Sequence, residues 1–237
     1  MSADQFGKLV FSGGAIRFDP DRIARPDAFL FDPAAPQLQA APVQVGGRQA
    51  AWYVAGDFGS GVLRHYHRGG FMARLSLDHY VWAGARRTRS FAEFELLDFM
   101  SRRGLAVPKP LAAIYWRHAA SYRAAILVER ISNVQALAKA LTQPHHRAVA
   151  RAIFAMHNAG VWHADLNAYN ILLDGRNQAW LIDFDRGRRR AVTPRLRDAN
   201  LLRLRRSLIK VAGTVGLDYW NEINRAYQDL LRDKSDR

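Results

Sequence analysis

Short apolar runs separated by glycine turns dominate the first half of the chain. Runs at 43–45, 52–54 and 62–66 are divided by glycine-containing segments, a pattern typical of short antiparallel strands. Two more apolar runs, at 114–116 and 124–128, predict two further strands. We therefore expect an antiparallel meander over 43–66 and five strands in total in this half of the chain.

The spacing of apolar residues changes to a helical one between the third and fourth of these predicted strands. Four apolar residues recur at a three-residue step within 89–103 and share one face of a helix that Gly104 ends; they are Phe91, Phe94, Leu97 and Met100. Residues 1–40, by contrast, have no clear period and contain four prolines. We predict an irregular N-terminal arm over 1–40 and a β-rich N-lobe over 41–131 with one inserted helix.

Helical spacing prevails in the second half. Apolar residues at helical spacing predict one helix from near residue 143 to 160 and further helices over 196–235. Two short apolar runs, 171–173 and 180–182, predict a hairpin between them. The pattern thus predicts a mainly helical C-lobe over 132–237 and an α+β fold overall.

The loop before this hairpin carries the candidate chemistry. Residues 163–170 read H-A-D-L-N-A-Y-N, and the hairpin ends in Asp183. A carboxylate, an amide five residues later and a second carboxylate are the groups that hold Mg²⁺ and ATP beside a hydroxyl acceptor. We predict Asp165 as the catalytic residue that takes up or orients the acceptor hydroxyl, and Asn170 and Asp183 as Mg²⁺ ligands. For His163 we predict a structural role that braces the loop.

The segment after Asp183 indicates which class of acceptor is used. Only about a dozen residues separate it from the next helical pattern, and no A-P-E motif follows, so the segment is too short to dock a protein substrate. We therefore expect a small molecule, a sugar or a lipid. Asp185 either adds a third acidic group near the metal or pairs with the arginines of 186–190; the second interpretation is favoured.

The third predicted strand carries a candidate phosphate-binding cation. Arg64 stands where kinases place a lysine that contacts the α- and β-phosphates, and its guanidinium makes the same charge contact with different geometry. The partner expected on the inserted helix is Glu93, with Glu95 as the alternative. An ordinary surface ion pair is the competing interpretation.

Two further segments complete the predicted nucleotide site. Gly46 and Gly47 lie between two strands, where glycines let backbone N–H groups approach phosphate, but a plain hairpin turn has the same sequence. The segment 127–131, which includes Glu129, is the connector whose backbone would contact adenine. Together with the catalytic loop, these segments favour a bilobal, protein-kinase-like fold.

The amino-acid composition indicates which classes of binding partner and which compartment to expect. The chain of 237 residues has a formal net charge of +14 and no cysteine. The charge favours anionic partners, such as nucleic acid, an acidic membrane surface or phosphorylated ligands. The lack of cysteine fits a reducing cytoplasm. The sequence shows neither a signal peptide nor an apolar stretch of membrane-spanning length, so we expect any contact with a membrane to be peripheral.

Several motifs resemble one family over residues 45–210. The blocks at 62–71, 80–82, 86–91 and 104–110, together with H-A-D-L-N-A-Y-N and D-F-D, are similar to the 3-deoxy-D-manno-octulosonic acid (Kdo) kinases of lipopolysaccharide biosynthesis. The resemblance implies ATP-dependent phosphorylation of a Kdo hydroxyl on a Kdo–lipid A precursor. It places the reaction at the cytoplasmic side of the inner membrane of a Gram-negative bacterium.

The predicted acceptor contacts are basic residues that follow the third strand, and a solvated basic face is the competing interpretation. They are Arg68, Arg74, Arg86, Arg87 and Arg89. A related heptose or aminoglycoside kinase is one alternative function, although cationic aminoglycosides fit the basic charge poorly. A nucleic-acid-binding pseudokinase is another, disfavoured because the three catalytic-site residues are intact. The oligomeric state is not predicted.

Overall fold

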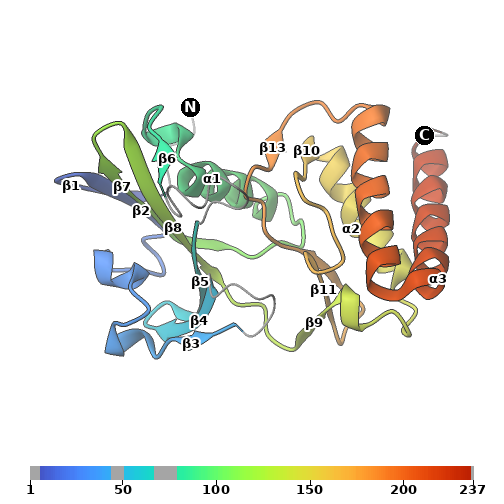
Figure 1. The fold of residues 1–237 in the computed structure, drawn as a ribbon, viewed down its shortest axis with the longest axis horizontal. Coiled ribbons are helices and arrows are strands. Elements are labelled where there is room, and N and C mark those ends of the chain that lie inside the picture. The colour runs from blue at the N-terminus through green and yellow to red at the C-terminus, as the bar shows by residue number, and fades with distance from the viewer. Residues whose placement is uncertain (1–5, 44–50, 67–78, 236–237) are drawn as a thin grey trace. The chain divides into compact units, whose positions relative to one another are not determined.

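The computed structural model describes residues 6–43, 51–66 and 79–235. The chain divides into two compact units (Figure 1). The first consists of Met1–Asp98 and Lys109–Arg130, and the second of Phe99–Pro108 and Ile131–Arg237. Within the described residues the fold is mixed, with a β-rich sheet and three α-helices.

An antiparallel sheet in the order β1-β2-β7-β8-β5-β4-β3 forms the first unit, and β6 pairs with β8. The strands are β1 (Gly7–Phe11), β2 (Gly14–Phe18), β3 (Ala41–Pro42), β4 (Ala51–Gly56), β5 (Gly59–His65), β6 (Tyr80–Val81), β7 (Pro110–His118) and β8 (Ser121–Glu129). The four strands predicted between 52 and 128 are confirmed as β4, β5, β7 and β8. Buried side chains of β2, β5, β7 and β8 form a core with residues of the segment 23–38.

The structure corrects the prediction for residues 1–40. This segment contains the β1–β2 hairpin, and β2 pairs with β7 from Gly14↔Trp116 to Phe18↔Ala112. Periodicity missed β2 because Ala15 and Ile16 are both buried, so its apolar residues do not alternate with polar ones. The two-residue turn Ser12-Gly13, with Gly13 at φ +80°, was the available signal.

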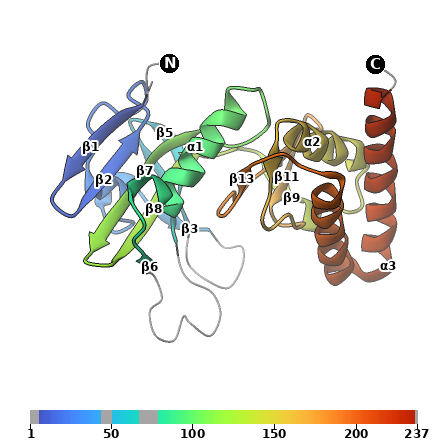
Figure 2. The same cartoon turned by 90° about the horizontal axis from the view of Figure 1, so that it is seen from above.

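The inserted helix is confirmed as α1 (Arg89–Ser101). Its predicted apolar face is buried, with Phe94 and Met100 at 0% exposure. The helix lies beside the sheet (Figure 2), where the Ser90 hydroxyl donates to the carbonyl oxygen of Ile114 in β7 at 2.8 Å. This packing presents Glu93 of α1 to the strand that carries Arg64.

The second unit combines helices with small sheets (Figure 1). α2 (His146–Asn158) and the hairpin β11 (Ile171–Asp174) and β12 (Ala179–Leu181) confirm the predicted helix and hairpin. The remaining elements are β9 (Val134–Ala136), which pairs with β11, β10 (Val161–Trp162), which pairs with β13 (Arg188–Arg189), and α3 (Pro194–Ser235). α3 is interrupted by non-helical geometry at Ala212 and Gly213.

In the part of the chain that the structure describes, no helix is both long enough and apolar enough to cross a bilayer.

Candidate active site

The 163–170 loop connects β10 to β11, and its own polar groups hold its shape. The Asn167 carboxamide oxygen accepts from the backbone N–H groups of Tyr169 and Asn170 at 2.9 and 3.2 Å, and its amide nitrogen donates to the carbonyl oxygen of Asp165 at 3.2 Å. An Asn that bonds the backbone two and three residues later stabilises a turn without regular secondary structure. The loop therefore has a defined geometry.

His163 braces this loop from within. Its side chain is completely buried, and Nε2 lies 3.0 Å from the carbonyl oxygen of Ile182. A carbonyl only accepts, so Nε2 carries the proton and Nδ1 accepts from the backbone N–H of Asp165 at 3.0 Å. Burial lowers the pKa of His163, which keeps the ring in this neutral form. These contacts agree with the predicted structural role.

A hydrogen bond joins the Asn170 side chain to the backbone of Asp165. The Asn170 amide nitrogen donates to the carbonyl oxygen of Asp165 at 2.9 Å. This bond uses the nitrogen of the carboxamide, so the oxygen Oδ1 is the atom that can serve a cation. The Asp165 side chain is 57% exposed, which leaves its carboxylate accessible to a reactant.

Asp183 follows β12 and lies next to the loop. The backbone N–H of Ile182 donates to the carbonyl oxygen of Asn170 at 3.0 Å, so the chain brings Asp183 close to Asn170. After burial and the Ile182 hydrogen bond, the charges of Asp183 and Asp165 are the next influences on the His163 pKa, and both raise it. Both carboxylates are therefore close enough to His163 to influence its pKa.

Asp183 also has an uncommon backbone conformation. Its φ is +62°, in the left-handed region that costs a non-glycine residue roughly 1 kcal/mol or more. Asp and Asn tolerate this region better than other side chains because they are short and polar. Such strain at a predicted metal ligand is typical of a functional position.

Arg203 of α3 was missed by the sequence analysis. Its Nη1 donates to Oδ1 of Asp165 at 2.8 Å, and its side chain is 47% exposed. In the sequence it is one of many arginines on a helix, and no local pattern distinguishes it. The structure adds it to the site.

A buried hydrogen-bond network supports the loop from beneath. The Asn200 amide nitrogen donates to the carbonyl oxygen of His163 at 2.7 Å, and its carboxamide oxygen accepts from Nε2 of His157 at 3.1 Å. The Tyr227 hydroxyl donates to Nδ1 of His157 and accepts from Arg197, at 2.7 and 2.8 Å. Burial lowers the pKa of His157 to about 4, so this ring is neutral near pH 7.

In the first unit, Arg64 pairs with Glu93 as predicted. Arg64 Nη2 lies 2.6 Å from both carboxylate oxygens of Glu93, which is only 3% exposed, and the Tyr66 hydroxyl donates to Oε2 at 2.6 Å. Glu95, the alternative partner, instead pairs with Arg17. A buried carboxylate bonded by a cation and a hydroxyl is a rigid anchor, which fixes where the Arg64 guanidinium lies.

The other predicted nucleotide contacts are less informative. Gly46 and Gly47 lie outside the described residues. The backbone N–H of Glu129 donates to the carbonyl oxygen of Lys109 at 2.8 Å, and Oε1 accepts from Arg22 at 3.3 Å. The backbone N–H of Arg130 also donates, to the carbonyl oxygen of Ser60 at 3.0 Å. The contact of the 127–131 connector with adenine stays a prediction.

The predicted acceptor arginines differ in their surroundings. Arg68 and Arg74 lie outside the described residues, whereas Arg86 and Arg87 are exposed. The Arg89 guanidinium lies 4.7 Å from the centroid of the Tyr80 ring, a packing contact. The acceptor role of Arg86, Arg87 and Arg89 stays a prediction.

The candidate metal site does not depend on a cluster of acidic, His or Cys side chains. Over residues 6–43, 51–66 and 79–235, no three or more of these side chains are grouped so as to hold a metal ion. The predicted site uses one amide and one carboxylate, Asn170 and Asp183. Mg²⁺ accepts such a small protein contribution when phosphates and waters supply the other oxygens.

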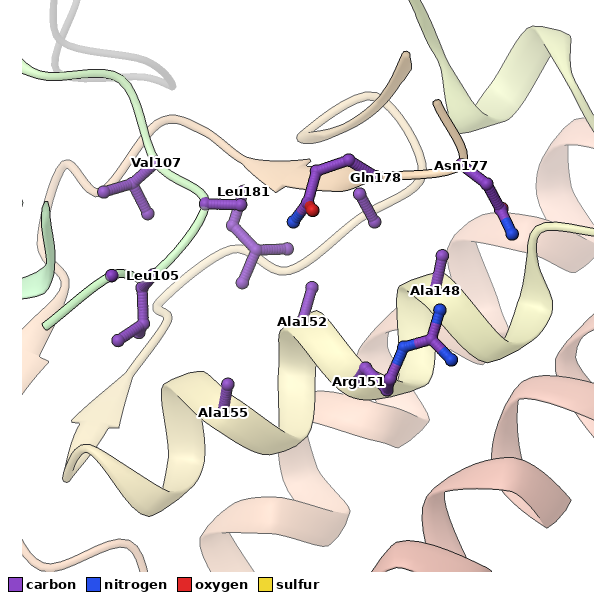
Figure 3. A pocket seen from close by; sticks show the side chains of 12 residues that line it. Leu105, Val107, Ala148, Arg151, Ala152, Ala155, Asn177, Gln178 and Leu181 are labelled. Atoms are coloured by element: carbon purple, nitrogen blue, oxygen red, sulfur yellow. The ribbon is translucent and has the colours of Figure 1, made fainter. Parts of the chain in front are cut away.

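A cavity of about 240 Å³ lies elsewhere in the second unit. The segment 104–107, α2 and the β11–β12 hairpin line it, and Figure 3 shows Leu105, Arg151 and Leu181 among its side chains. Residues 165, 170 and 183 are not part of its lining. The cavity is therefore distinct from the catalytic loop.

Comparison with known proteins gives a consistent family. The family model described as "Lipopolysaccharide kinase (Kdo/WaaP) family" matches residues 34–227. A 3-deoxy-D-manno-octulosonic acid kinase of Xanthomonas campestris pv. campestris is 49% identical over 224 residues, which are 91% of this chain and 90% of that protein. A protein of the same name from Stenotrophomonas maltophilia is 50% identical over 223 residues, 92% of this chain and 88% of that protein. The chain therefore belongs to the lipopolysaccharide kinase (Kdo/WaaP) family of phosphotransferases.

Proposed function

We propose that this chain transfers the γ-phosphoryl group of ATP to a hydroxyl of a Kdo residue on a Kdo–lipid A precursor. Membership of a kinase family implies the use of ATP. The names of the relatives, which are about half identical to this chain, support Kdo as the acceptor sugar. The observation that carries the proposal is the accessible Asp165 carboxylate in a loop fixed by His163 and Asn170.

The chemistry assigned to Asp165 is general-base catalysis. The acceptor hydroxyl gives its proton to the Asp165 carboxylate, and its oxygen forms a bond to the γ-phosphorus. The bond from this phosphorus to the β–γ bridging oxygen breaks, and the electron pair leaves with ADP. Asp165 is thus the base that the reaction requires.

Mg²⁺ is the proposed metal. Asn170 and Asp183 fit it. The Asn170 amide nitrogen is engaged with Asp165, so its oxygen is left as a ligand, and the backbone hydrogen bond from Ile182 to Asn170 brings Asp183 close to Asn170. When bound, the ion neutralises charge on the phosphates. The protein residues hold it and orient the acceptor.

Two features support a bilobal, protein-kinase-like fold as part of this proposal. One is the family, and the other is the division into a sheet-rich unit and a mainly helical unit. Only residues 184–193 separate Asp183 from α3, which begins at Pro194. This short connection supports a small or lipid acceptor over a protein.

The membrane surface is the proposed location, on the cytoplasmic side of the inner membrane. The formal net charge of +14 suits an enzyme whose acceptor carries carboxylates and phosphates and lies in an anionic bilayer. The same charge would retain nucleic acid, so charge alone does not identify the acceptor. Transfer of label to a Kdo lipid and not to duplex DNA would separate these two classes of acceptor.

We expect the purified protein to transfer ³²P from γ-labelled ATP to vesicles that contain Kdo–lipid A precursor. Matched vesicles with the same lipid lacking Kdo should remain unlabelled, because the acceptor hydroxyl belongs to the sugar. Duplex DNA should neither accept label nor stimulate ATP use. Label on the Kdo-free lipid or on heptose alone would contradict the proposed acceptor.

Sedimentation of the same vesicles tests the location. The protein should bind anionic vesicles better than zwitterionic ones, and salt should release it, because each basic group near an anionic surface contributes about 1 kcal/mol and screening acts within about 10 Å at 0.1 M salt. Transfer to soluble Kdo without any vesicle binding at low salt would refute the membrane-surface proposal and leave the kinase activity standing.

Arg64 provides a separate test of the nucleotide site. We expect Arg64→Ala to raise the KM for ATP about 10-fold or more without changing the KM for the acceptor, since one charged phosphate contact is worth roughly 1.5–3 kcal/mol. This variant also removes the cation from the buried Glu93 carboxylate, so its unfolding temperature should fall.

Arg64→Lys distinguishes the loss of the phosphate contact from the loss of stability. It keeps the charge but loses the forked geometry, so part of the ATP affinity should return. Steady-state kinetics with each substrate varied in turn measures both constants. A change confined to the acceptor KM would place Arg64 outside the nucleotide site.

A further inference from the structure

One face of α3 contacts the catalytic loop at three points. Asn200, Arg203 and Ser207 are spaced by three and four residues, so they lie on one side of the helix. Asn200 donates to the carbonyl oxygen of His163 at 2.7 Å, and Arg203 to Oδ1 of Asp165 at 2.8 Å. The Ser207 hydroxyl oxygen accepts from the backbone N–H of Ala168 at 3.1 Å. The helix thus contacts the loop before, at and after the catalytic carboxylate.

Buried apolar side chains of the helix and of the loop accompany these polar contacts. Leu204 and Leu208 of the same helix are completely buried, as are Leu166 and Ala168 of the loop. Packed side chains limit movement of the helix against the loop, so a side chain on this face has a defined position relative to Asp165. The contacts of α3 are therefore suited to positioning.

Charge explains why Arg203, the middle one of these three contact residues, is an arginine. The loop sequence H-A-D-L-N-A-Y-N contains no Lys or Arg, so a cation beside Asp165 has to come from another element. Asp183 also lies next to this loop, because the backbone N–H of Ile182 donates to the carbonyl oxygen of Asn170, and the phosphates of a bound nucleotide add more negative charge. Arg203 offsets this repulsion at Asp165 itself.

The geometry also distinguishes the two oxygens of the carboxylate. Arg203 binds Oδ1, which leaves Oδ2 to receive the proton of the acceptor hydroxyl. A carboxylate held at one oxygen keeps the other in a fixed direction, which is the condition for efficient general-base catalysis.

We propose that Arg203 is a positioning residue for phosphoryl transfer, which holds Asp165 so that Oδ2 faces the nucleophile, and that Asn200 and Ser207 fix the loop on either side. This inference rests on the proposed function for the identity of the acceptor. The positioning applies to any nucleophile at the site, and that includes the water that hydrolyses ATP when no acceptor is present.

Arg203→Ala is the first test. With Kdo–lipid A precursor, kcat should fall about 10-fold or more while the KM for ATP changes little, because the lost interaction orients the base and does not bind nucleotide. The unfolding temperature should stay the same, since an ion pair with side chains 47% and 57% exposed contributes little to stability. Arg203→Lys should recover part of kcat.

Two further variants sharpen the result. Arg206→Ala removes the same charge one turn further along α3, at another exposed position, and should keep wild-type kcat. Ser207→Ala removes the acceptor for the Ala168 N–H and should lower kcat without affecting ATP affinity. An equal loss in the Arg203 and Arg206 variants would show that only nearby charge matters and would overturn the proposal, as would unchanged kcat in Arg203→Ala.

The wild-type protein separates this inference from the proposed function. If it transfers no label to the Kdo lipid, the proposed acceptor is wrong, and the same variants are then compared by their acceptor-independent hydrolysis of ATP. The order of rates should be the same: wild type and Arg206→Ala highest, Arg203→Lys intermediate and Arg203→Ala lowest. Any other order would overturn the positioning role.

Discussion

Asp165→Asn should lower turnover about 100-fold or more while nucleotide binding persists, since general-base catalysis typically contributes that much. Asn has the shape of Asp and keeps the oxygen that accepts from Arg203, so the loop should be unchanged. The lost property is the capacity to take a proton. Initial rates with the Kdo lipid, together with calorimetric titration of ATP, measure the two effects separately.

The control for this substitution is Asp218→Asn. Asp218 is an exposed residue of α3 in the same unit, and the change of charge is identical. This variant should have wild-type turnover. Near-wild-type turnover in Asp165→Asn as well would remove Asp165 from the role of base.

Asp183→Asn should weaken Mg²⁺-dependent binding of ATP by about 10-fold, or about 1.4 kcal/mol, and should also abolish most turnover. Asn tolerates the left-handed backbone at φ +62°, so this substitution preserves the local conformation while it removes the charge that attracts the metal. Asp165→Asn should bind ATP in the presence of Mg²⁺ nearly as well as the wild type.

Chelation of the metal provides the matched control. In EDTA the wild type and both Asp→Asn variants should bind ATP alike, because the difference between them depends on the metal. Titration of Mg²⁺ at fixed ATP should then separate Asp183→Asn from the other two proteins. Identical Mg²⁺ dependence in all three would rule out Asp183 as a ligand.

Local sequence patterns predicted most of the regular elements. α1 follows from the three-residue apolar step that buries Phe94 and Met100, and the β11–β12 hairpin follows from two apolar runs around a polar turn. The Arg64–Glu93 pair was also predictable, because only two carboxylates of α1 lay at suitable positions. These features depend on periods or motifs within one short segment.

The features that the sequence did not predict depend on distant segments. The β1–β2 hairpin joins β7, about a hundred residues away in the chain, and the contacts of Asn200 and Arg203 with the loop span 37 and 38 residues. A polar residue on a helix looks solvated until the loop packed against it is known. The pairing of β2 with β7 and the contacts of α3 with the loop join residues far apart in the sequence. Such contacts produce no periodic pattern in the local sequence, so the sequence did not predict them.

The β1–β2 hairpin has a practical consequence for where the folded region begins. The family match starts at residue 34, after both strands, yet Ala15 and Ile16 of β2 are buried in the sheet of the first unit. A fragment trimmed to the matched boundary would uncover the edge of β7 and its unpaired backbone groups, which is the usual template for edge-to-edge aggregation. Any truncation or tag should therefore leave residues 7–18 in place as part of the folded protein.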